Sequence, residues 1–263
     1  AFARDADRRT RQLLYRATDG LAASVDPVTA VHVLNTTSWP RTDLVELPPD
    51  WNLPGDLVQG SDGRPVASQR LSTGALAFVA VDVPPFGAAA YTIHAGAAHS
   101  AGSATAAGAG LSNDLLEIAV DEQSGAIRSF LRRGIATDLV NTNGRMGLND
   151  YYYVAGRNPE KPQRNGRTRI LVRDAGPVMA CLRILSDAPG CRSLVRDVRI
   201  VTGLDRVDLF DVLDKEKTYK QEGVHLAFPF QVPDGVMKID TPWAIVRPEA
   251  DQIPGACKNY FTV

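Results

Sequence analysis

The stretch RTRILVRDAGPVMACLRILSDAPGCRSLVRDVRIVTGLDRVDLFDVLD, residues 167–214, decides the fold class of this chain. Its segments 167–175, 177–187, 192–203 and 205–214 alternate apolar with polar residues, and Gly, Pro or Asp mark several of the junctions between them. Alternation with a period of two predicts strands that have one wet and one dry face. Short turn-like junctions place such strands side by side in antiparallel order. The stretch therefore predicts a sheet of a large antiparallel sandwich.

Strand patterns extend outward from this stretch in both directions. LLEIAVDEQSGAIRSFL (115–131) predicts a hairpin around Ser124-Gly125. Further short β-branched segments lie at 29–37, 43–47, 75–83, 89–95, 222–232 and 236–240. We therefore expect an all-β fold, in which a small β domain (27–95) precedes a large antiparallel β-sandwich (111–263).

Two segments depart from the strand pattern. Residues 2–22 have apolar side chains at helical spacing, so residues 1–26 are predicted to hold one N-terminal helix ending near Gly20. Residues 96–110 are mostly Ala, Gly and Ser, a composition that buries little apolar area. We interpret 96–110 as a flexible linker, in which His99 is solvated.

Composition excludes several functional classes. The 263 residues include 29 basic and 30 acidic side chains, a net charge of -1, which argues against a nucleic-acid partner. No apolar run is long enough to predict a membrane span. The abundance of Ala and Arg hints at a bacterial source and leaves cytoplasm, periplasm and secretion open. Cys181 and Cys191 could pair across a hairpin, but with three cysteines in all, buried free thiols are favoured.

Catalytic and metal-binding motifs are lacking. The sequence has no phosphate-binding glycine loop, no G-x-S-x-G, no H-E-x-x-H and no Cys-x-x-Cys, and its four histidines lie far apart. Asp205, Asp208, Asp211 and Asp214 recur at three-residue steps, and we predict solvated positions for them rather than a catalytic pair. Asn35-Thr36-Thr37 is a formal glycosylation sequon.

Four stretches resemble, in the same order, the region beyond the catalytic domain in glycoside hydrolase family 38, the α-mannosidases. They are VHVLNTTSWPRTDLVELP (31–48), LSNDLLEIAVDEQSGAIRSFL (111–131), GLNDYYYVAG (147–156) and the residues from Asp214 onward. The resemblance implies a C-terminal β-rich region without its catalytic barrel, with a galactose-mutarotase-like sandwich that lacks its last strands. The N-terminal helix would then be the tail of the family's helical bundle.

The resemblance also implies the chemistry of the parent protein. Family 38 enzymes are retaining α-mannosidases whose zinc ligands and catalytic carboxylates belong to the barrel, so no catalytic residue, metal ligand or cofactor is assigned to this chain. The implied partners are a mannose-containing glycan, the catalytic barrel and, for some assemblies, a second copy of the chain.

Candidate supporting residues follow from side-chain chemistry. Asn149, Tyr151 and Tyr153 could line a sugar pocket, although Tyr151 and Tyr153 could instead be core residues while Tyr152 faces outward. Asp251 and Gln252, in a polar loop, are further substrate-proximal candidates, with an ordinary solvated loop as the alternative. Lys215 and Glu222 could brace the interface with the barrel or simply be solvated.

Two other functions remain as alternatives. A stand-alone carbohydrate-binding module would need an exposed aromatic platform from Trp39, Trp51, Trp243 and the tyrosines, yet Trp39 and Trp243 adjoin prolines and are expected to pack. A mutarotase-like enzyme would need His225 and Glu222 to face one cleft.

Overall fold

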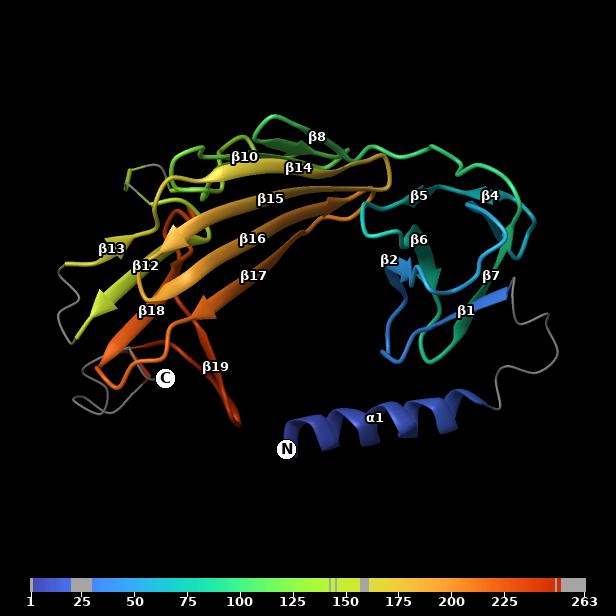
Figure 1. Cartoon of the computed structure of the whole chain (residues 1–263), viewed down its shortest axis with the longest axis horizontal. Coiled ribbons are helices and arrows are strands. Elements are labelled where there is room, and N and C mark those ends of the chain that lie inside the picture. The colour runs from blue at the N-terminus through green and yellow to red at the C-terminus, as the bar shows by residue number, and fades with distance from the viewer. Residues whose placement is uncertain are drawn as a thin grey trace.

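A computed structural model describes residues 2–19, 30–141, 143–144, 146–156, 161–248 and 250–251. Antiparallel sheets account for most of it, so the all-β prediction is confirmed (Figure 1). The helix α1 spans Phe2–Asp19, and its predicted end at Gly20 lies outside the described residues. Its Leu13 side chain is 65% exposed, so the apolar stripe of α1 is not buried against the sheets. No helix in the described ranges is both long and apolar enough to span a bilayer.

The small β unit consists of two antiparallel sheets packed face to face. Its strands are β1 (Ala30–Leu34), β2 (Arg41–Leu47), β3 (Leu57–Gly60), β4 (Pro65–Val66), β5 (Ser68–Arg70), β6 (Leu76–Val83) and β7 (Ala88–His94). The sheet orders are β1-β7-β3-β4 and β2-β6-β5. Alternate residues of each strand point between the sheets, where the tilted rings of Phe78 and Tyr91 pack with centroids 4.8 Å apart.

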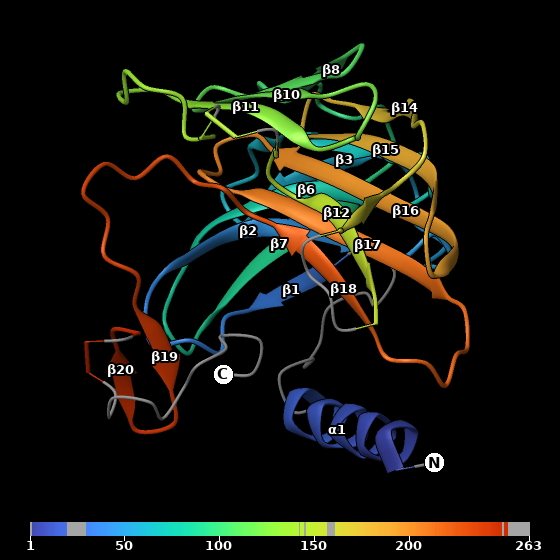
Figure 2. The ribbon, with the colours of Figure 1, turned by 90° about the vertical axis from the view of Figure 1, so that its left-hand side faces the viewer.

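The large sandwich has two stacked four-stranded sheets, seen end-on in Figure 2. One contains β8 (Thr105–Ala107), β9 (Gly110–Ser112), β10 (Leu116–Val120) and β11 (Ile127–Arg132). The other contains β14 (Arg169–Ala175), β15 (Met179–Ala188), β16 (Cys191–Val201) and β17 (Val207–Lys215), the strands predicted from residues 167–214. Between the sheets lie Leu111, Ile118, Ile127, Leu182, Ile184, Val198 and Ile200, all nearly inaccessible.

Two smaller sheets complete the fold. Strand β12 (Asp150–Ala155) lies between β13 (Gln163–Arg164) and β18 (Glu222–Ala227) at one end of the sandwich (Figure 1). Strands β19 (Ile239–Thr241) and β20 (Ala244–Val246) form a separate hairpin. Cys181 and Cys191 are buried free thiols, as favoured from the sequence, whereas Cys257 lies outside the described residues.

The expected flexible linker at 96–110 is wrong for its second half. Strand β8 and the first residue of β9 fall within it, and Ala104 is fully buried in the sandwich core. The small residues serve close packing here, because a Cβ on Gly102 would collide with the carbonyl of Pro177. His99 is exposed, as predicted, although its carbonyl accepts a hydrogen bond from the Ser68 N–H.

The two β units share a third core where the start of β15 meets the sheet β2-β6-β5. Ala77 and Val79 of the small unit pack there with Val178, Met179 and Val201 of the sandwich. Because this apolar surface is continuous between the units, neither can turn against the other without exposing it to water.

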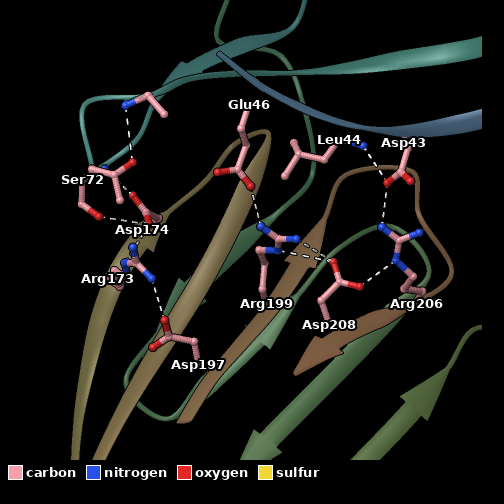
Figure 3. Close-up of polar contacts among 12 residues, drawn as sticks. Asp43, Leu44, Glu46, Ser72, Arg173, Asp174, Asp197, Arg199, Arg206 and Asp208 are labelled. Carbon is pink, nitrogen blue, oxygen red and sulfur yellow. Dashed lines mark hydrogen bonds and ion pairs between the residues drawn. The ribbon is translucent and has the colours of Figure 1, made fainter. Parts of the chain in front are cut away.

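Ion pairs surround this shared core, as Figure 3 shows. Arg199 binds Glu46 at 2.6 Å, and Arg206 binds Asp43 at 2.7 Å, so two sandwich arginines reach carboxylates of the small unit. Asp208 lies between these arginines and pairs with both. Asp174 accepts the backbone N–H of Ser72 at 2.7 Å. Together these contacts fix the relative orientation of the two units.

Candidate functional site

The stretch around Asn149 forms the start of β12. Asn149 has a φ of 60°, and Asn tolerates this left-handed conformation better than most residues. The turn delivers the chain into the pairing of β12 with β18, where Tyr151 lies opposite Leu226 and Tyr153 opposite Val224. The structure thus brings the Asn149–Tyr153 candidates into one ladder with the strand that begins at Glu222.

Tyr151 is a core residue. Its side chain is fully buried against Ala188, Cys191 and Leu194, and its hydroxyl donates to the Pro189 carbonyl at 2.6 Å. Burial raises the pKa of this hydroxyl well above its usual value. A sugar ring has no access to this side chain, so the prediction of a substrate-proximal Tyr151 is wrong and its core alternative applies.

Tyr153, Glu222 and Lys215 form a chain of contacts at the same end of the sandwich. The Tyr153 hydroxyl donates to Glu222 Oε2 at 2.7 Å, and Lys215 Nζ lies 2.5 Å from Glu222 Oε1. The hydrogen bond from Lys215, followed by that from Tyr153, lowers the pKa of the Glu222 carboxyl. The two residues assigned to interface bracing therefore bind each other across β17 and β18, and a contact with a further domain stays a prediction.

A buried polar cluster lies behind Asn149, inside the sandwich. Arg196 on β16 is fully buried and stands directly opposite Asp211 on β17. Arg196 Nη1 donates to the Asn149 carbonyl at 2.9 Å, and Asn149 Nδ2 donates to Asp211 Oδ1 at 2.9 Å. Burial raises the pKa of Asp211 and lowers that of Arg196, since it disfavours both charged forms.

Asp150 extends this cluster toward the surface. It is fully buried and pairs with Arg164 on the neighbouring strand β13. Asn149 Oδ1, Asp150 Oδ1 and Arg196 Nε are buried side-chain atoms with no hydrogen-bond partner within the described ranges. Each such atom lowers the stability of the fold by about 1–3 kcal/mol, because it has lost its hydration without gaining a hydrogen bond. Three of them in one cluster therefore make this polar interior costly to fold.

The sequence contained a signal for this cluster that the alternation argument missed. Arg196 falls in phase with Leu194, Val198 and Ile200, which all face the core, and Asp211 falls between the inward-facing Leu209 and Leu213. The prediction of a solvated Asp211 is therefore wrong, because its position in the strand directs it inward.

The other three aspartates of that series lie at or near the surface in ion pairs. Asp205 pairs with Arg132 at 2.5 Å, and Asp214 with Arg192 at 2.9 Å. Asp208 is half-buried between Arg199 and Arg206. None of the three faces another carboxylate as a catalytic pair would.

The loop at Asp251 closes on itself. Asp251 binds Arg247 at 2.7 Å and accepts the Arg247 backbone N–H at 2.8 Å, which together lower the pKa of Asp251 to about 2. No contact of Asp251 joins it to Asn149 or Tyr153, and Gln252 lies outside the described residues.

Trp39 and Trp243 do not pack as expected, and Trp51 is exposed as well. Trp39 is 60% exposed, Trp51 is 49% exposed and the Trp243 side chain is fully exposed. The backbone of Trp39 contacts the fold: the Trp39 carbonyl accepts a hydrogen bond from the buried Asn35 side chain at 2.7 Å. Asn35 Nδ2 also donates to the Val83 carbonyl, so this sequon nitrogen is engaged in the fold rather than presented for modification.

His225 and Glu222 do not form a catalytic pair. They lie three residues apart on β18, so their side chains point to opposite faces of the sheet. The mutarotase-like alternative required both to face one cleft and fails on this geometry. Within the described part of the chain, no group of three or more His, Cys, Asp or Glu side chains could hold a metal ion.

No family model matches this chain, and no curated protein sequence matches it.

Proposed function

We propose that this chain is the C-terminal β-rich accessory region of a retaining α-mannosidase of glycoside hydrolase family 38. The observation that carries the proposal is the order of the four family-like stretches along a chain that folds as a small β unit followed by a large sandwich. In this proposal hydrolysis is performed by a separate catalytic domain, which supplies the zinc ion and the catalytic carboxylates.

The roles of the resembling residues support this proposal. Asn35, from the first stretch, closes the small unit through hydrogen bonds to two carbonyls. Gly125, from the second, turns the β10–β11 hairpin at a φ of 70°. Asn149, from the third, directly precedes β12 at positive φ and binds Asp211. The resemblance therefore includes residues on which the fold of this chain depends.

The function that fits this architecture is rigid support. The shared core and its ion pairs hold the two β units as one body, and the Tyr153–Glu222–Lys215 contacts stiffen the β12–β18 end. Such a body suits a wall against which a catalytic domain is positioned, because rigid elements keep a site within the narrow tolerance that catalysis requires.

A stand-alone carbohydrate-binding module finds less support. Trp39, Trp51 and Trp243 are exposed, but they lie in three separate loops, and no contact among the described residues gathers them into a platform. The tyrosine that the platform most needed, Tyr151, is buried.

Hydrolysis of a chromogenic α-mannoside in the presence of zinc tests the proposal. This chain is compared with the same chain joined to the sequence that precedes it in its own protein. We expect no turnover by the chain alone and zinc-dependent turnover by the longer protein. Turnover by the chain alone, or a longer protein that is inactive on α-mannosides, would contradict the proposal.

A further inference from the structure

An amphiphilic groove of about 1030 Å³ opens along β14, away from the residues discussed so far. Its walls are the β8–β9 turn, the β10–β11 turn and the segment that leads into β14. Strand β8, at the edge of its sheet, lies near β14, at the edge of the other sheet, in Figure 1, so the groove follows the side of the sandwich at which its two sheets part. A volume of this size is at the upper end of the range of small-molecule sites, about 300–1,000 Å³.

The polar side of the groove carries side-chain groups without a partner in the described part of the chain, although Asn165 Nδ2 donates to the Gly166 carbonyl at 2.8 Å. Glu122, Gln123 and Arg167 have no side-chain hydrogen bond or ion pair with the described residues. Asn165 Oδ1, which is buried, also lacks a partner there. Elsewhere in the sandwich arginines are commonly paired with aspartate, as Arg132, Arg192 and Arg199 are. A glutamate and an arginine that line one groove without pairing leave their hydrogen-bonding capacity for a ligand.

The opposite side of the groove is apolar. Ile170 and Val172 alternate with Arg169 and Leu171 along β14, so their side chains share one face, and Val172 is 45% exposed. The Thr168 hydroxyl is turned away onto the Glu122 carbonyl, to which it donates. The groove thus combines an apolar strip with a rim of donors and acceptors.

From this arrangement we propose that the groove binds a neutral saccharide. A pyranose has a C–H face for the Ile170–Val172 strip and hydroxyls that both donate and accept. Glu122 would accept and Arg167 would donate, while Gln123 can do both. Asn165 Oδ1 would accept, because Asn165 Nδ2 already donates to the Gly166 carbonyl. Among the described lining residues, one Glu and one Arg are the ionisable side chains, so their charges cancel and neither an anion nor a cation is favoured. The inference goes beyond the proposed function, which assigns no ligand to this groove; Glu122 and Gln123 belong to the second family-like stretch (111–131), but neither side chain has a role in that proposal.

Titration of this chain, labelled with ¹⁵N, tests the site by NMR. The probes are methyl α-mannoside, α-linked mannobiose and maltose, with inorganic phosphate as a charged control. We expect at least one neutral saccharide to shift the amide signals of residues 122–123 and 165–168 to saturation, and phosphate to leave them unchanged. Arg167→Ala and Gln123→Ala should each lower the affinity for the bound probe about tenfold, as expected when a hydrogen bond to a ligand is lost.

Matched variants control for general effects of the substitutions. Arg64→Ala removes an exposed arginine of the small unit, and Gln221→Ala an exposed glutamine before β18; neither residue lines the groove. Both should bind the probe as the native chain does. The proposal is overturned if no neutral saccharide shifts these signals, if the shifts map to other residues, if Arg167→Ala and Gln123→Ala bind normally, or if phosphate occupies the groove instead.

Discussion

Gln69 of the small β unit holds Met179 of the large sandwich through both ends of its side-chain amide. The Met179 N–H donates to Gln69 Oε1 at 2.9 Å, and Gln69 Nε2 donates to the Met179 carbonyl at 3.1 Å. The same oxygen accepts the Val178 N–H at 2.9 Å. Gln69 is 8% exposed, so water cannot replace these bonds without opening the shared core. One side chain thus satisfies three backbone groups at the start of β15.

Gln69→Leu should destabilise the whole described β structure. The substitution keeps the apolar stem but leaves two buried N–H groups and one carbonyl without this partner, at a cost of about 2–4 kcal/mol. Because the shared core couples the units, urea denaturation should show one transition at a lower midpoint rather than early loss of the small unit alone.

The control for this experiment is Gln221→Leu, since Gln221 is exposed. Its free energy of unfolding should stay within about 0.5 kcal/mol of that of the native chain. Equal effects of the two substitutions would show that the Gln69 amide does not hold the units together.

Asp211 should make the stability of the sandwich depend on pH in the sense opposite to an ordinary surface aspartate. Burial raises its folded-state pKa, despite the hydrogen bond from Asn149 and the charge of Arg196. The folded chain therefore holds the proton more tightly than the unfolded chain. Its contribution is complete below the unfolded pKa of about 3.9 and is lost as pH rises through the raised folded value. Asp211→Asn stays neutral, so its stability relative to the native chain should improve from pH 4 to pH 7 in urea titrations.

Asp214→Asn is the matched control on the same strand. The hydrogen bond from Arg192 lowers the pKa of Asp214, so its contribution is present above the unfolded pKa and is lost as pH falls. Relative to the native chain, this variant should become less stable from pH 3 to pH 7. If Asp211→Asn followed the same trend as Asp214→Asn, the buried environment assigned to Asp211 would be incorrect.

The contacts of Glu222 can be ranked by their effect on its carboxyl. Lys215 and Tyr153 both lower its pKa, Lys215 more than Tyr153. Lys215→Met and Tyr153→Phe should therefore both raise the pKa of Glu222, with the larger rise in Lys215→Met, because removing a charged donor costs the carboxylate more than removing a neutral one. The ¹³C shift of the Glu222 carboxyl, followed against pH, measures both changes, and an unchanged or reversed order would contradict the geometry.

Alternation of apolar and polar residues predicted the fold well for strands that have one buried and one solvated face. Residues 167–214 supplied β14 to β17 because apolar residues such as Leu182 and Ile184 recur at every second position and are all buried. The same argument failed at 96–110, because the burial of Ala104 depends on how closely two backbones approach, and composition alone does not reveal that distance.

The candidate site could be predicted only in part. Asn149 does directly precede the strand that pairs Tyr153 with the β18 strand of Glu222, but the buried arginine behind it was not predicted, because a charged side chain within an alternating strand gave no sign of facing the core. The exposure of Trp243 could not be predicted either, since it depends on the position of the β19–β20 turn relative to the sandwich.

Gly125→Ala should disturb the buried arginine, and Gly203→Ala separates that effect from backbone strain. The two glycines have φ values of 70° and 71°, so alanine costs each a similar conformational penalty of about 1–2 kcal/mol. A Cβ at Gly125 would also collide with Arg196 Nη2 and Ile184 Cγ2, whereas one at Gly203 meets no atom within 4 Å. Arg196 Nη2 cannot move aside freely, because it donates to the Ser124 carbonyl. Gly125→Ala should therefore lower the free energy of unfolding by about 1–3 kcal/mol more than Gly203→Ala does. Equal losses in urea denaturation would mean that the hairpin moves away from Arg196 at no cost, and that the cluster is not tightly packed.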